Sequence, residues 1–152
     1  MAKSKLSVGD KIPEFKLPNE KGEEQIISPN DGVKRVIYFY PKDNTKVCTA
    51  QACSFRDFHS DFIKQGYEVI GISGDSIKSH EKFAARYNLD FTLLSDKQAK
   101  VRKMFGVSAL LGLISGRKTF VVNEKGIIEF AYDAMMEDEE HINKTLDFIK
   151  LK

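Results

Sequence analysis

The chain lacks any apolar run approaching the roughly 20 residues needed to span a lipid bilayer. It also lacks a strong charge of one sign, because 24 basic residues are nearly balanced by 22 acidic ones and the net charge is +2. This balance argues against binding to nucleic acid or to an acidic membrane surface, and we expect neither partner. The first residues, Met1 to Leu6, contain no apolar signal-peptide core, so we expect a cytoplasmic protein.

Cysteine is scarce, with two residues in a chain of 152. Two cysteines cannot build the disulfide framework of a small secreted domain, and in a reducing compartment such residues are more typical of catalysis or redox sensing. Repeats, low-complexity tracts and linkers are also absent from the sequence. The length and a hydrophobic content of 41% therefore predict one soluble domain over residues 1–152 with a full core.

Strand-like and helix-like segments alternate along the chain. Nearly continuous apolar runs at Arg35–Tyr40 and Glu68–Ser73 predict central strands, and a helix carrying both cysteines lies between them. The other predicted elements are a hairpin (15–17 and 25–28), a helix (77–87), a strand (91–94), a short helix (98–105), a second hairpin (118–122 and 127–132) and a last amphipathic helix bearing Ile142, Leu146, Phe148 and Ile149. This order predicts an α/β protein with a thioredoxin-like fold, in which helices cover both faces of a central mixed sheet and the first hairpin is an N-terminal extension.

Cys48 follows a short polar loop and stands where a helix from about Thr49 to Lys64 is predicted to begin. Unpaired backbone N–H groups and the positive end of the helix dipole favour the thiolate form at such a place. The expected apolar face of this helix consists of Ala52, Phe55, Phe58, Phe62 and Ile63. At roughly 100° per residue, Cys48 projects toward that face and Cys53 points about 140° away, toward solvent.

Both cysteines belong to this one predicted helix. Five residues of α-helix separate two Cα atoms by about 8 to 9 Å, whereas a disulfide requires less than about 7 Å. Cys48 and Cys53 therefore cannot pair unless the start of the helix unwinds. A pair of structural free cysteines is the alternative, but their positions favour a redox couple with a conformational step.

The segment before and around Cys48 resembles the peroxiredoxins, which are thiol peroxidases on a thioredoxin fold. The resemblance rests on the pattern Pro41-x-x-x-Thr45-x-x-Cys48, and a second cysteine five positions later is similar to the subgroup called peroxiredoxin Q or bacterioferritin comigratory protein. It extends over nearly the whole chain through the segments 9–15, 54–57, 69–73, 91–96 and 116–120. The pattern departs from the family at Lys46-Val47, where members usually carry Pro-Gly.

This resemblance implies a role for each of five residues. Cys48 would be the peroxidatic nucleophile, oxidised to a sulfenic acid, and Cys53 the resolving cysteine that forms a Cys48–Cys53 disulfide. Arg117 would lie beside Cys48 and supply positive charge. The hydroxyl of Thr45 would bind the peroxide, and Pro41 would fix the loop and shield the thiolate.

The resemblance also implies the partners. The substrate would be hydrogen peroxide or an organic hydroperoxide, a thioredoxin-type dithiol would restore the thiols, and the protein would work as a monomer without metal, haem or flavin. The plastid stroma becomes a possible location if a transit peptide has been removed. Gln51 stands where many members have Glu, and it could accept a hydrogen bond from Arg117. The histidines, His59, His80 and His141, lack cysteine or carboxylate companions at ligand spacing, so we expect no metal site.

Two other functions are compatible with a reactive cysteine on this fold. A peroxide sensor or redox relay would share the first oxidation and signal through the unwound helix. A general thiol–disulfide oxidoreductase usually carries Cys-x-x-Cys, which is absent here. The apolar stretch Ala109–Ile114 is interpreted equally well as a packed loop or as an exposed wall near the site.

Overall fold

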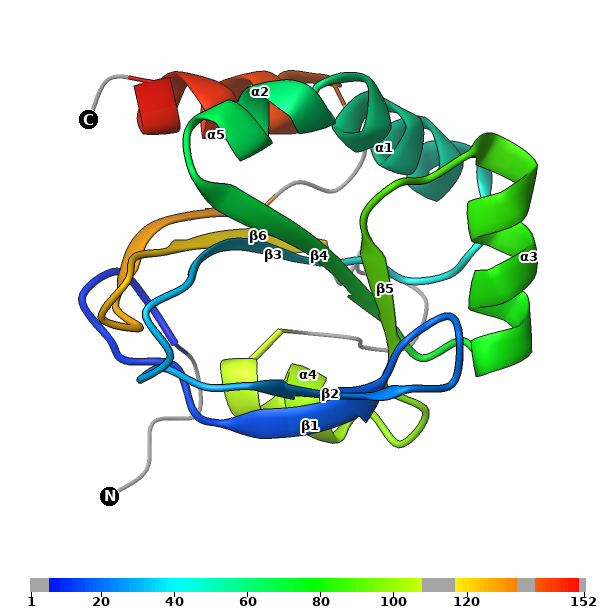
Figure 1. Cartoon of the computed structure of the whole chain (residues 1–152), viewed down its shortest axis with the longest axis horizontal. Helices are drawn as coiled ribbons and strands as arrows, with labels where there is room; N and C mark the ends of the chain where they lie inside the picture. The colour runs from blue at the N-terminus through cyan, green and yellow to red at the C-terminus, as the bar shows by residue number, and fades with distance from the viewer. Residues whose placement is uncertain (1–5, 108–116, 134–138, 151–152) are drawn as a thin grey trace.

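A computed structural model describes residues 6–107, 117–133 and 139–150. Its strands are β1 (Phe15–Pro18), β2 (Glu24–Ile27), β3 (Lys34–Phe39), β4 (Tyr67–Ser73), β5 (Thr92–Ser95), β6 (Lys118–Val122) and β7 (Ile128–Asp133). Its helices are α1 (Lys46–Asp57), α2 (His59–Lys64), α3 (Ile77–Tyr87), α4 (Lys100–Phe105) and α5 (Glu139–Lys150). Figure 1 shows how these elements form layers above and below one central sheet.

The central sheet has five strands in the order β5-β4-β3-β6-β7. The first three strands of that order run parallel, whereas β6 and β7 pair antiparallel, so the sheet is mixed as predicted. At its centre, β3 pairs Val36 with Val69 of β4 and with Val121 of β6. β1 and β2 form the predicted separate hairpin.

Successive side chains of β3 point to opposite faces of the sheet, so the core consists of two clusters, one on each face. Val36, Tyr38 and Tyr40 belong to the first cluster, which α1, α2, α3 and α5 cover. Ile37 and Phe39 point to the opposite face and belong to the second cluster, which α4 and the β1–β2 hairpin cover. Figure 1 shows α1, α2 and α5 on one side of the sheet and α4 with the hairpin on the other. The expected thioredoxin-like layering is therefore confirmed, although the hairpin shares the second face with one short helix.

The helix that carries the cysteines differs from its prediction at three points. It begins at Lys46 rather than near Thr49, and it is interrupted at Phe58, where φ is −99° and ψ is 7°. The helix starts earlier because Thr45 takes the extended N-cap conformation and its carbonyl already accepts the first helical hydrogen bond, from the N–H of Thr49. Because α2 begins anew after this interruption, its side chains do not point in the directions expected for one continuous helix. Phe62 of α2 is buried, whereas Ile63, expected to face inward, is 54% exposed.

The other predicted elements agree closely with the structure. α3 and β6 have the predicted bounds, and in α5 the side chains of Ile142, Leu146 and Ile149 are buried. The stretch Ala109–Ile114 lies outside the described residues. Within the described ranges, no helix combines the length and apolar character that a membrane crossing requires.

Candidate active site

Cys48 lies in the first turn of α1, on the buried side of the helix. Thr45 is the N-cap residue in an extended conformation, and its carbonyl accepts the first helical hydrogen bond from the N–H of Thr49 at 2.8 Å. Cys48 is thus the third helical residue and not the cap itself, and its exposed fraction is 1%. Helix geometry leaves the N–H groups of this first turn without intrahelical acceptors, so they create a positive field around the sulfur.

The structure brings Arg117 to this sulfur from the far end of the sequence. Arg117 immediately precedes β6, and strand alternation puts it on the same face as Thr119 and Val121, toward the cluster that contains Cys48. Its Nη2 donates to Cys48 Sγ at 3.0 Å, and its Nη1 donates to Gln51 Oε1 at 3.0 Å. The hydrogen bond expected between Gln51 and Arg117 is therefore confirmed.

The three side chains form a buried unit. Cys48, Gln51 and Arg117 are 1%, 0% and 6% exposed. A guanidinium cannot lose its proton in a protein, so Arg117 places a permanent positive charge 3.0 Å from the sulfur in a medium of low dielectric. Gln51 holds the guanidinium without adding a charge that would oppose this effect.

Thr45 and Pro41 lie on the loop that joins β3 to α1, and both residues are exposed. The hydroxyl of Thr45 donates to the carbonyl of Lys42 at 2.9 Å. It makes no hydrogen bond to the helix N–H groups, so Thr45 caps α1 by its backbone conformation alone. Its hydroxyl oxygen still has lone pairs with which it can accept a further hydrogen bond.

Cys53 lies in the same helix as Cys48 but on another side of it. Both cysteines are free; Cys48 is buried and Cys53 is partly exposed, as their helical phase predicted. Because α1 runs without interruption from residue 46 to 57, helical geometry holds their Cα atoms about 8 to 9 Å apart, beyond the range of a disulfide.

This arrangement can be compared with known proteins: a mixed α/β fold carries a buried cysteine next to an arginine, with a second cysteine in the same helix. The AhpC/TSA family matches residues 8–131. A curated chloroplastic peroxiredoxin Q from Sedum lineare is 45% identical over 97% of the chain and 80% of the relative. The chain belongs to the peroxiredoxin Q group of this family. It is therefore a thiol-dependent peroxidase and an oxidoreductase.

Solved structures support the same family. A crystallised peroxidoxin from Mycobacterium tuberculosis superposes with a TM-score of 0.88 at 31% identity, covering 96% of this chain and 97% of the other. A peroxiredoxin Q from Xanthomonas campestris superposes with a TM-score of 0.81 at 30% identity, covering 90% of each chain. Another curated relative, the chloroplastic peroxiredoxin Q of Arabidopsis thaliana, is 44% identical over 97% of this chain and 68% of its own length.

The structure also assembles a polar cluster in this peroxiredoxin that the sequence did not predict. Asp43, in the loop before α1, is 4% exposed and contacts His80 of α3, with 2.7 Å between Oδ2 and Nδ1. Asp75, which follows β4, accepts a hydrogen bond from the backbone N–H of Asp43 at 2.8 Å. The expectation that His80 lacks carboxylate companions is therefore wrong, because residues 37 and 5 positions away along the chain fold against it.

Asp43, Asp75 and His80 offer ligand atoms within 4.8 Å of one another, a spacing compatible with a metal ion. However, protein donors already bind both carboxylates: Asp43 accepts from Ser79 and Asp75 accepts from Ser73, at 2.8 and 2.6 Å. A metal would have to displace these hydrogen bonds, so the donor set fits an internal network better than a metal site.

A second buried arginine reaches the same region from the opposite layer. Arg102 of α4 donates through Nη2 to the carbonyl of Tyr40 at 2.9 Å, at the end of β3. Burial lowers the pKa of Arg102 from its usual value, while the electrostatic influence of Asp96 and, less strongly, of Cys48 acts in the opposite direction. Sequence reasoning missed Arg102 because it sits in an ordinary amphipathic helix without any motif.

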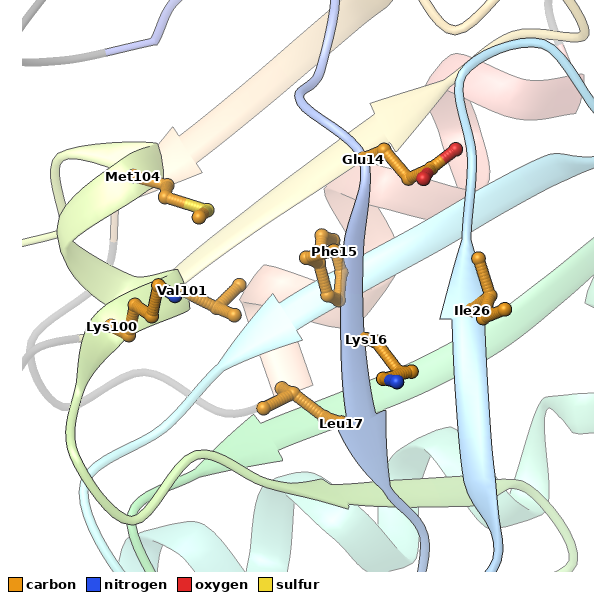
Figure 2. Close-up of a pocket in the computed structure, with 8 residues that line it drawn as sticks. All are labelled: Glu14, Phe15, Lys16, Leu17, Ile26, Lys100, Val101 and Met104. Carbon is orange, nitrogen blue, oxygen red and sulfur yellow. The ribbon is translucent and has the colours of Figure 1, made fainter.

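A surface pocket of about 470 Å³ lies away from this site, between the β1–β2 hairpin and α4. Figure 2 shows Val101 and Met104 of α4 pointing toward β1, with Phe15 on the facing strand. Phe15 and Val101 belong to the second core cluster, on the face of the sheet that does not contain Cys48. The pocket is therefore not the place where peroxide meets the thiolate.

Proposed function

We propose that the peroxidase works through Cys48 as its nucleophile. The Cys48 thiolate attacks one peroxide oxygen and breaks the O–O bond, giving a sulfenic acid and, after one proton is taken up, water or an alcohol. The observation that carries this assignment is the 3.0 Å contact of Arg117 with Sγ in a buried site. Arg117 and the N–H groups at the start of α1 stabilise the negative charge that develops on the leaving oxygen.

We assign the two exposed loop residues supporting roles in the same step. The Thr45 hydroxyl accepts a hydrogen bond from the incoming peroxide while it remains bonded to the carbonyl of Lys42. Pro41 contributes no N–H group and fixes φ, which stiffens the loop next to the thiolate. The substrates are hydrogen peroxide and organic hydroperoxides; a solved structure of the related Xanthomonas campestris protein was described together with its alkyl peroxide reduction activity.

Cys53 completes the cycle in this proposal. Its thiol attacks the sulfenic sulfur of Cys48, releases water and leaves an intramolecular disulfide, and the first turns of α1 unwind to bring the two sulfurs together. A thioredoxin-type dithiol then reduces this bond by exchange and is itself oxidised. We expect a monomeric single-domain enzyme of about 17.3 kDa, in the cytoplasm or in the plastid stroma. The plastid option is supported by plant relatives that are named chloroplastic.

The test is peroxide consumption coupled to thioredoxin, thioredoxin reductase and NADPH. Cys48→Ser should abolish turnover, because a hydroxyl does not ionise near neutral pH. Cys53→Ser should still be oxidised once by peroxide but should stop turning over with thioredoxin. Retention of a tenth of the wild-type turnover by Cys48→Ser would remove Cys48 from its assigned role. Light scattering of the reduced protein gives its mass in solution and tests the monomer directly.

A further inference from the structure

The loop from Pro41 to Thr45 has a single buried side chain, that of Asp43, which attaches it to the rest of the protein. Between Pro41 and Lys46, every residue is exposed except Asp43. The carboxylate of Asp43 accepts a hydrogen bond from the Tyr40 hydroxyl at 2.5 Å and from the Ser79 hydroxyl at 2.8 Å. Burial raises the pKa of Tyr40 well above its usual range, so this hydroxyl keeps its proton and remains a donor.

Asp43 is also tied by its backbone and through His80. Its N–H donates to the carboxylate of Asp75, just beyond β4, and the other ring nitrogen of His80 donates to the carbonyl of Leu94 in β5 at 3.0 Å. One loop residue is thus connected to the end of β4, to α3 and to β5. These three elements do not take part in the proposed unwinding of α1.

The two ring nitrogens of His80 both take part in the attachment. Both ring nitrogens of His80 face acceptors, and because the carbonyl of Leu94 can only accept, Nε2 must carry a proton. Nδ1 makes the 2.7 Å contact with the carboxylate of Asp43, so both ring nitrogens have a hydrogen-bond partner. A fully hydrogen-bonded polar network is a rigid attachment point in a buried site.

We propose that Asp43, held by His80, is a positioning residue for the peroxidase reaction. It fixes the loop in front of α1, two residues before the N-cap and five before Cys48, so that the first helical turn is presented to peroxide. Loosening this attachment releases the same turn to unwind. Cys48 reacts with peroxide while the first turn of α1 is helical, and the disulfide forms when that turn is unwound. Asp43 therefore determines the relative rates of these two steps. This inference rests on the roles proposed above for Cys48 and Cys53.

The test compares rate constants for the separate steps in three variants. Asp43→Ala removes every side-chain contact of the attachment. Asp43→Asn can keep the contacts, because the amide oxygen accepts from Tyr40 and the amide NH2 donates to Nδ1 of His80 and to the hydroxyl of Ser79, which then accepts instead of donating. Asp90→Ala is the matched control: it breaks another His–Asp pair, with His59 at 3.0 Å, whose aspartate is 59% exposed and lies far from the loop in sequence.

Rapid mixing with hydrogen peroxide, followed by thiol trapping and intact mass measurement, separates sulfenic acid, disulfide and sulfinic acid. We expect Asp43→Ala to slow Cys48 oxidation at least about tenfold, because small misplacement of a reacting group is costly. The same variant should form the disulfide faster and yield less sulfinic acid than wild type. Asp43→Asn should stay within about threefold of wild type, and Asp90→Ala should be unchanged.

Three results would overturn the inference. One is an unchanged oxidation rate constant in Asp43→Ala with only a smaller amplitude, which is the behaviour of a merely destabilised protein. Another is equal slowing of oxidation and disulfide formation. The third is an Asn variant as slow as the Ala variant. If wild type itself is not oxidised at Cys48, with Cys48→Ser as reference, the proposed function fails instead. Should Asp43→Ala not fold, Tyr40→Phe removes one hydrogen bond without leaving a charge unpaired, and the same shift in both steps, smaller in size, is expected.

Discussion

Replacing Arg117 with methionine tests the electrostatics of the site. Methionine keeps much of the apolar stem of arginine but removes the guanidinium, whose Nη2 lies 3.0 Å from Cys48 Sγ. Both side chains are almost fully buried, so water cannot replace the lost donor easily. The substitution therefore removes a charge from next to the reacting sulfur with little change in volume.

The size of the effect can be worked out from this contact. A hydrogen bond to a charged group contributes about 1.5 to 3 kcal/mol. The bare Coulomb attraction at 3 Å and an effective dielectric constant near 20 is about 5.5 kcal/mol, before the desolvation of both groups is subtracted. Since 1.4 kcal/mol corresponds to about a factor of ten, the rate constant for Cys48 oxidation should fall roughly 10- to 150-fold in Arg117→Met.

The assay should follow the mass of the quenched protein, because the chain contains no tryptophan to report the reaction by fluorescence. Arg86→Met is the matched control, since Arg86 is exposed on α3 and contacts only the ring of Tyr87 among the interactions described for it. Arg117→Lys should lie between wild type and Arg117→Met, because it keeps the charge but loses the paired donors. A rate constant within threefold of wild type in a folded Arg117→Met protein would refute this account of the site.

Three further outcomes are expected. In amide exchange, residues 49–55 should lose protection when the Cys48–Cys53 disulfide forms, because the bond cannot close across an intact helix. Gly71→Ala should lower the free energy of unfolding by about 1 to 3 kcal/mol, because its Cβ would lie 2.8 Å from the ring of Tyr38, which is itself stacked at 4.3 Å on Phe55. Asp31→Asn should destabilise the protein by less than about 1 kcal/mol at pH 7 and equally at pH 5. The hydrogen bond from Arg35 holds the pKa of Asp31 below its usual 3.8, so this contribution is present above that value and disappears as the pH falls below it.

Each of these outcomes has its own control. Equal exchange protection in the reduced and the disulfide-bonded protein would show that no unwinding occurs. Gly74→Ala should be nearly neutral in urea unfolding, because its Cβ would meet only the carbonyl of Asp96 at 3.6 Å. A similar loss of stability in both glycine variants would show that the contact with the Tyr38 ring is not the cause. For Asp31→Asn, urea unfolding at pH 7, 5 and 3 shows the pH range over which the Asp31 carboxylate stabilises the protein. A loss of stability that is larger at pH 3 than at pH 7 would contradict the expected pH dependence.

The sheet and most helices could be predicted because their signals are local. Apolar runs bounded by glycine, asparagine and aspartate marked β3, β4 and β6, and periodicity marked α3. The start of α1 was missed by three residues because Thr45 caps the helix with its backbone and makes no side-chain cap hydrogen bond. Threonine is a favoured N-cap residue type, but a single threonine in a polar loop does not show which residue begins the helix.

The site could be predicted only in part. The helical phase of the two cysteines is a local property, and it gave the buried position of Cys48 correctly. Arg117 lies 69 residues from Cys48, and only family resemblance linked them before the structure did. The contact of Asp43 with His80 spans 37 residues and depends on how α3 packs beside the loop, which no local pattern reveals.

The location of both cysteines in one uninterrupted helix has a thermodynamic consequence under the proposed cycle. The dithiol form retains the folded first turns of α1, whereas the disulfide form must give them up. The free energy of folding these turns is therefore part of the reduction potential of the couple. Each 1.4 kcal/mol of added helix stability should raise that potential by about 30 mV, making the enzyme a stronger oxidant of its dithiol partner. A substitution in α1 that never touches sulfur or peroxide would in this way adjust which reductants can regenerate the enzyme.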